Sequence, residues 1–204
     1  MENLIQYFEN IPSLHRSIIL VGGITLFWLI EGLVPTRKLA YKKWRHALPN
    51  FFFTATSVLV NFFLAFLLLN TADWTQANGF GLLHIFALPL WLYVVLGVLL
   101  LDFIGAYLAH LVEHKIKPLW MVHLVHHSDH HVDTTTANRH HPLESLVRFS
   151  FTLVAVFILG TPIGVVMLYQ SLSVVLSQFN HANINLPTRL DQWLSYVLVT
   201  PHMH

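Results

Sequence analysis

Long apolar segments separated by short polar ones dominate the chain. Three of them cover residues 18–34, 51–69 and 80–101, and each contains only isolated polar side chains. A membrane span needs about 20 mostly apolar residues, so each segment is predicted to form a membrane-embedded helix. Pro89, inside the third segment, is expected to kink its helix.

A fourth apolar segment, residues 149–179, is too long for one span and is interrupted by Gly160, Pro162 and Gly164. Glycine and proline favour a break, so we predict two short helices that enter the membrane and return as a hairpin. Nothing in the chain alternates as strands do. The predicted fold is therefore an all-α integral membrane protein with about four membrane-embedded helical segments, the last being the hairpin.

Composition supports a membrane protein and excludes several functions. Hydrophobic residues make up 55% of the 204 positions and charged residues only 10%, where soluble domains average about 25%. The net charge of +1 provides no basic surface for nucleic acid. The absence of cysteine excludes disulfides, thiolate zinc sites, iron–sulfur clusters and a haem-thiolate oxygenase.

The distribution of basic residues predicts the orientation. If the hairpin returns, ten of the 11 Lys and Arg residues fall on one side of the membrane and only Arg16 on the other. The basic side is expected to be cytoplasmic, in a bacterial inner membrane or alternatively the endoplasmic reticulum. We expect one domain over residues 1–204, with a membrane stalk (mainly 16–101 and 149–179) and a cytoplasmic histidine-rich helical cap (mainly 102–148 and 180–204).

Histidine is unusually abundant, with 15 residues, nine of them between positions 110 and 141. His110 and His114 are one helical turn apart, and His123, His126 and His127 share an arc of roughly 100° on a helix. Neutral imidazole binds iron, copper, zinc and nickel well. Five histidines exceed what one tetrahedral ion can use, which suggests two metals, or one metal with further histidines around it.

The other histidines carry weaker signals. His130 and His131 could be ligands or solvated loop residues, and His15, His46 and His84 are isolated, so packing is the better interpretation for them. Asp102 is placed either to hydrogen-bond a ligand imidazole or simply to end a helix at the membrane surface.

The histidine motifs resemble those of the fatty acid hydroxylase/sterol desaturase superfamily of membrane di-iron enzymes, from about Asp102 to the end of the chain. The similar segments are His110-x-x-x-His114, the run from Trp120 through His123-x-x-His126-His127 to Asp129, Asn138 to Glu144, Phe179 to Ile184, and Thr200 to His204. The family's third box is His-x-x-His-His, and His204 matches its first histidine. We therefore expect the parent gene to continue with two residues and then His-His. Without those two ligands the chain would bind metal weakly or lack activity.

The resemblance implies a centre of two iron ions, with zinc as a possible substitute, that activates O₂ to hydroxylate or desaturate a lipid such as a sterol, fatty acyl chain or ether lipid. It also implies an external electron donor: a ferredoxin, a b-type cytochrome or a flavoprotein reductase. The implied metal ligands are His110, His114, His123, His126, His127, His181 and His204. Residues expected beside the ligands, or as further candidates, are His202, His141, His140, Arg139, Asp102, His130 and His131.

Other interpretations remain open. His110-Leu-Val-Glu113-His114 also fits an inverted zinc-protease motif with Glu113 as general base, and His127-Ser-Asp129 imitates part of a facial triad. A metal transporter would place ionisable residues at mid-bilayer depth, whereas these histidines cluster at one face. A catalytically inactive scaffold that binds zinc is a further alternative.

Overall fold

The computed structural model describes all 204 residues and consists of helices without a β-strand. Five helical segments are long and apolar enough to cross a membrane, which confirms the predicted all-α membrane fold. These segments comprise α2 (Ser13–Leu33), α3 (Lys43–Ala77) with the short turn η1 (Leu82–His84), α4 (Leu90–Asp102) continuing through η2 (Phe103–Leu108) into α5 (Ala109–Lys115), α7 (Pro142–Leu159) and α8 (Ile163–His181).

The third span begins later than predicted. Residues 80–88 form a loop with η1, and Pro89 is the residue that caps the start of α4 rather than a kink within it. Proline is favoured at helix starts because its missing N–H has no partner there in any case. At its other end, α4 passes without a break into η2, a π-helical turn that directly precedes the histidines of α5.

The predicted hairpin is present, but its two arms are full-length spans of 18 and 19 residues rather than short helices. Gly160 ends α7 with φ +69°, and a Cβ there would lie only 2.1 Å from the carbonyl oxygen of Phe80. The Gly160 carbonyl accepts hydrogen bonds from the side chains of Gln76 and Tyr93. The turn is therefore held closely against the loop that follows α3.

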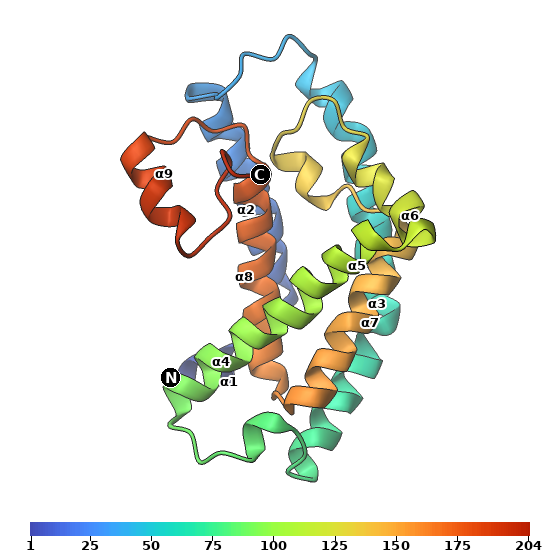
Figure 1. The fold of residues 1–204 in the computed structure, drawn as a ribbon, viewed down its shortest axis with the longest axis vertical. Coiled ribbons are helices and arrows are strands. Elements are labelled where there is room, and N and C mark those ends of the chain that lie inside the picture. Colours follow the sequence, from blue (N-terminus) through green and yellow to red (C-terminus); the bar gives the residue numbers. More distant parts are fainter.

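Helix α8 runs through the middle of the molecule and contacts α1 (Glu2–Glu9), α2 and α4, while α7 packs along α3 (Figure 1). Between α3, α4, α7 and α8 lies one buried apolar core. Its members are Leu68, Ala72, Leu83, Val94, Leu101, Phe149, Ala155, Val156, Leu159, Val165, Val166, Leu168 and Tyr169.

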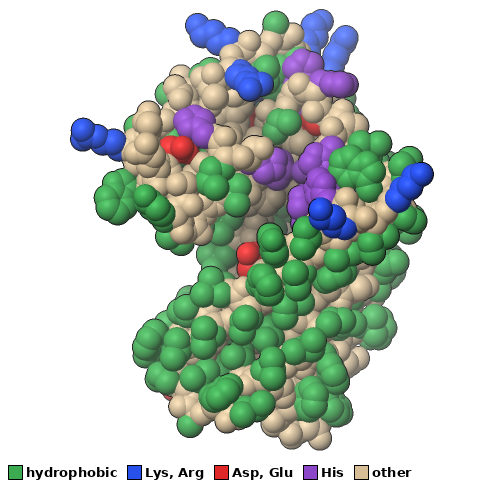
Figure 2. Space-filling view, viewed as in Figure 1, with side chains coloured by type: hydrophobic (Ala, Val, Ile, Leu, Met, Phe, Trp, Pro, Cys, Tyr) green, Lys and Arg blue, Asp and Glu red, His purple; other side chains and the backbone are tan.

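The remaining elements gather at one end of this helical bundle. They are α6 (Lys117–His127), the short helix η3 (Thr134–Asn138) and α9 (Thr188–Ser195). In the view of Figure 2, Lys and Arg side chains lie only at this end, where several histidines border a hollow, and hydrophobic side chains cover the other half. The surface therefore divides into an apolar band suited to lipid and a polar cap that carries the histidines.

Candidate metal centre

Four histidines from two helices form the first group of the candidate metal centre. His110 and His114 are one turn apart on α5, as His123 and His127 are on α6. Nε2 of His114 lies 3.0 Å from Nε2 of His110, and Nε2 of His127 lies 3.2 Å from that of His114 and 3.1 Å from that of His123. A tetrahedral ion with metal–nitrogen bonds of about 2.1 Å separates its ligand atoms by about 3.4 Å. The four nitrogens are thus spaced as ligands of one ion.

A second group lies directly beside the first. It contains His126 of α6, His181 at the end of α8 and His204, with one ring nitrogen from each within 4.8 Å of the others. Nε2 of His126 is 3.1 Å from Nε2 of His181, and the ring of His126 stacks 5.4 Å from that of His123 in the first group. Because His126 and His127 are consecutive on a helix, their side chains diverge by about 100°, and each faces a different group.

Three of the convergent histidines, His126, His127 and His204, are held in the neutral form that binds metal. Burial lowers the pKa of His126 well below its usual value and lowers the pKa of His127 to about 4, with charge on His123 and His114 acting in the same direction. Burial also lowers the pKa of His204. Seven convergent imidazoles in two groups are a donor set that fits two ions of iron, zinc, copper or nickel.

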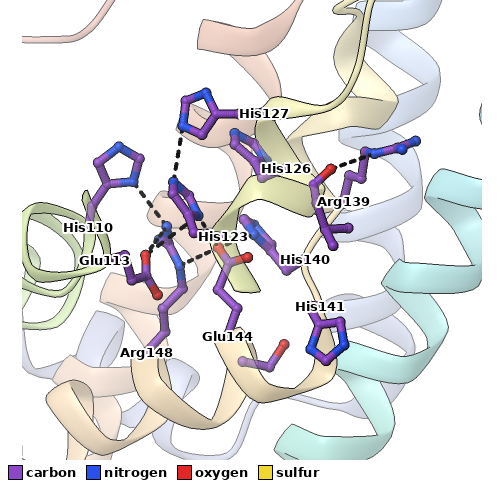
Figure 3. Close-up of polar contacts among 12 residues, drawn as sticks. His110, Glu113, His123, His126, His127, Arg139, His140, His141, Glu144 and Arg148 are labelled. Atoms are coloured by element: carbon purple, nitrogen blue, oxygen red, sulfur yellow. Dashed lines mark hydrogen bonds and ion pairs between the residues drawn. The ribbon is translucent and has the colours of Figure 1, made fainter. Parts of the chain in front are cut away.

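A buried carboxylate orients two of the rings (Figure 3). Glu144, in the first turn of α7 and 1% exposed, accepts hydrogen bonds from Nδ1 of His123 at 2.9 Å and Nδ1 of His140 at 2.7 Å. A carboxylate can only accept, so Nδ1 of His123 carries the proton and its Nε2 is free toward the first group. The ring of His140 in turn stacks on His126, with their centroids 5.1 Å apart.

Arg148 ties the first group to α7. Its guanidinium donates to Oε2 of Glu113 at 2.9 Å and to Oε1 of Glu144 at 3.1 Å, and it lies 3.1 Å from Nδ1 of His110. Since an arginine only donates, Nδ1 of His110 accepts, and the proton of that ring is on Nε2. For Nε2 of His110 to bind a metal ion, the ring proton must move to Nδ1, and Arg148 must then turn away from that atom.

Arg139 holds the end of α6 instead of touching a ligand. It donates to the carbonyl oxygen of Val125 at 2.9 Å and to the side chain of Asn50 at 2.9 Å. Asp129, just past α6, accepts a hydrogen bond from His46 at 2.8 Å. Burial alone would raise the pKa of Asp129, but hydrogen bonds from His46 and the His131 amide hold it below its usual value. These contacts join the end of α6 that carries His126 and His127 to α3.

The other predicted neighbours lie apart from the two groups. Asp102 is exposed and forms no hydrogen bond to an imidazole, so that expected contact is absent. His141 caps α7 by accepting the Leu143 amide and points away from the cluster (Figure 3). His131 stacks on Tyr41, His130 is exposed, and Nδ1 of His202 lies 3.4 Å from Asp191 of α9.

The geometry disfavours two of the alternative motifs. Glu113 is buried against Arg148, and its carboxylate groups with His123 and Glu144, not with His110 and His114 as a zinc-protease base would require. His127 belongs to the first histidine group, but Asp129 is hydrogen-bonded to His46 and belongs to neither group. The two residues therefore do not act together as the facial-triad motif requires.

The sequence patterns did not predict the ion pairs that hold the histidine rings and the end of α6 in place. The four-residue spacing of His140, Glu144 and Arg148, of which the last two share one face of α7, was a signal for the ion pairs that the structure contains. The pairing of His46 with Asp129, 83 positions apart, had no local signal.

Comparisons with known proteins agree with this site. The family model described as fatty acid hydroxylase matches residues 94–204, more than half of the chain. The chain belongs to this family. The matched part of this fatty acid hydroxylase family member contains all seven convergent histidines.

A curated relative is the ornithine lipid hydroxylase OlsE of Rhizobium tropici. It is 27% identical over 116 residues, which are 57% of this chain and 34% of the relative. This fatty acid hydroxylase family member therefore matches about a third of that protein's length. No solved structure matches the chain significantly.

Proposed function

We propose that this protein is a membrane-bound lipid hydroxylase whose two histidine groups hold a pair of iron ions. The observation that carries the proposal is the convergence of seven imidazoles in two adjacent groups within a fatty acid hydroxylase domain. Such a pair, when bound, activates O₂ for oxidation of a C–H bond. Desaturation by the same centre is the second outcome to be tested.

The chain's own residues provide the ligands, their orientation and an apolar border. Glu144 fixes the ring of His123 through Nδ1 and leaves its Nε2 free. Arg148 positions the ring of His110 by donating to Nδ1 and would have to release that atom for metal to bind. The indole of Trp120 covers the first group, with its ring 5.1 Å from His114 and 5.3 Å from His127. An apolar wall beside the ligands would hold a lipid carbon there and exclude water.

Substrate and electrons would arrive by different routes. The apolar band next to the histidine end would let a lipid reach the centre from the bilayer (Figure 2). The substrate class is a membrane lipid, for which the resemblance to an ornithine lipid hydroxylase offers one candidate. The chain has no dinucleotide fingerprint and no cysteine, so the electrons would come from a separate ferredoxin, b-type cytochrome or flavoprotein reductase. This donor would dock on the basic, cytoplasmic side.

The test combines lipid profiling with metal analysis. Membrane lipids of cells with and without the intact gene are compared by mass spectrometry, beside cells carrying His123→Ala as an inactive control. We expect a lipid heavier by one oxygen only when the intact gene is present. The purified intact protein should contain about two irons and consume O₂ when lipid and reductant are supplied.

Each alternative predicts a different result. A lipid lighter by two hydrogens identifies a desaturase. Zinc without O₂ uptake and without any lipid change identifies a structural metalloprotein and overturns the proposal.

A further inference from the structure

A groove away from the metal centre lies among three membrane-spanning helices. Its cavity of about 240 Å³ is bordered by α2, α3 and α8, with Asn138 of η3 also lining it. None of the seven convergent histidines lines it. The polar residues that matter for its chemistry are Arg16, Ser57, Asn61, Gln170, Ser171 and Asn138.

Arg16 has no counter-charge within the protein. Its guanidinium is exposed and forms neither a hydrogen bond nor an ion pair with any residue of the chain. It belongs to α2, a helix apolar enough to cross a membrane, and it lines the groove together with residues from the middle of α3 and α8. An unpaired charge in such a segment is costly, so a partner from outside the chain is expected.

The amides beside Arg16 are also free. The side chains of Asn61 and Gln170 make no hydrogen bond within the chain, and Nδ2 of Asn138 is buried without a partner. By contrast, the hydroxyls of Ser57 and Ser171 are already bonded, to Ser145 and to the Met167 carbonyl. One guanidinium and several free amide N–H groups form a site for a ligand that is anionic and rich in acceptors.

We propose that this groove binds an anionic phospholipid. The phosphodiester pairs with Arg16, and Asn61 and Gln170 donate hydrogen bonds to the ester carbonyls. Apolar residues of the same groove, among them Ile19 and Val174, contact the start of the acyl chains. A phospholipid fits because it combines these hydrogen-bond acceptors and a negative charge with acyl chains that the apolar lining residues can contact.

The test measures lipid binding to detergent-solubilised protein by native mass spectrometry. Dioleoyl phosphatidylglycerol is compared with dioleoylglycerol, which has the same chains without the phosphate, and with inorganic phosphate alone. We expect phosphatidylglycerol to bind and the other two not to. Arg16→Gln should weaken binding about tenfold or more, whereas Arg16→Lys should retain part of it.

Controls separate this site from other causes. Arg189→Gln, on the exposed helix α9, removes a charge elsewhere and should leave binding unchanged. Asn61→Leu with Gln170→Leu should weaken binding while Arg16 remains, so the proposal does not depend on one variant that could misfold. The readout needs neither metal nor O₂ chemistry, so it is independent of the proposed hydroxylase activity.

Three results overturn the proposal. The first is equal binding by the wild-type protein and Arg16→Gln, and the second is competition by inorganic phosphate alone, which identifies a free-anion site. The third is cross-linking of Asn61→Cys between two chains in place of lipid binding, which identifies an interface between copies.

Discussion

Nδ1 of His123 donates a 2.9 Å hydrogen bond to Oε1 of Glu144, and both side chains are fully buried. The two residues are 21 positions apart and lie on different helices, α6 and α7. Because the same carboxylate oxygen also binds His140, one acidic residue orients a ring of the first group and the ring that stacks on His126.

Replacing Glu144 by Gln should weaken metal binding about 10–100-fold, because an amide does not hold the His123 tautomer as a carboxylate does. Iron affinity is measured by titration of the purified protein. Glu9→Gln, at an exposed position of α1, is the matched control. Unchanged affinity in Glu144→Gln would show that the carboxylate serves packing alone.

Substitutions within the two histidine groups should each remove metal. His114→Ala in the first group and His181→Ala in the second should each lower the iron content by about one ion per chain, because we propose that each group holds its own ion. The measurement is elemental analysis of purified protein. His130→Ala, an exposed histidine outside both groups, should keep the wild-type content; if it lost as much iron, general misfolding would be the cause.

Acid should weaken the junction between η3 and α3. Burial alone would raise the pKa of Asp133, but the ion pair with His46 and hydrogen bonds from Thr135 and Tyr41 hold it below its usual value. The unfolded chain therefore takes up this proton at a higher pH than the folded protein. The stabilisation of the folded protein by ionised Asp133 is complete at neutral pH, and it is lost as the pH falls through the pKa that Asp133 has in the folded protein.

Asp133→Asn should consequently cost about 2 kcal/mol at pH 7. Its thermal midpoint should lie clearly below that of the wild-type protein at neutral pH, and the difference should shrink as both proteins are acidified toward about pH 3. A difference that stays constant across this range would contradict the assigned ionisation.

The α7–α8 turn should not tolerate a side chain. Gly160→Ala places a Cβ 2.1 Å from the Phe80 carbonyl at φ +69°, so the turn must shift and the free energy of unfolding should fall by more than about 1 kcal/mol. Gly32→Ala is the matched control, because a Cβ in that helix meets nothing within 4 Å. It should be neutral or slightly stabilising when thermal midpoints are compared.

Local patterns predicted the spans well but not where they begin. Apolar runs located all five crossing helices, because burial in lipid requires length and apolar character that are both visible in the sequence. The start of α4 at Leu90 was misplaced because the preceding apolar residues form a loop against the α7–α8 turn. Apolarity alone does not distinguish a helix from a loop packed on another helix.

The sequence by itself determined that the protein is helical, enters a membrane and carries imidazoles at helical spacing on one face. Only the tertiary structure decided that α6 contributes to both histidine groups, that Glu144 and Arg148 contact the rings of His123 and His110, and that Asp129 is hydrogen-bonded to His46. Helical periodicity is a local property that the chain displays directly. Contacts between residues tens of positions apart depend instead on how whole helices cross, which no local pattern specifies.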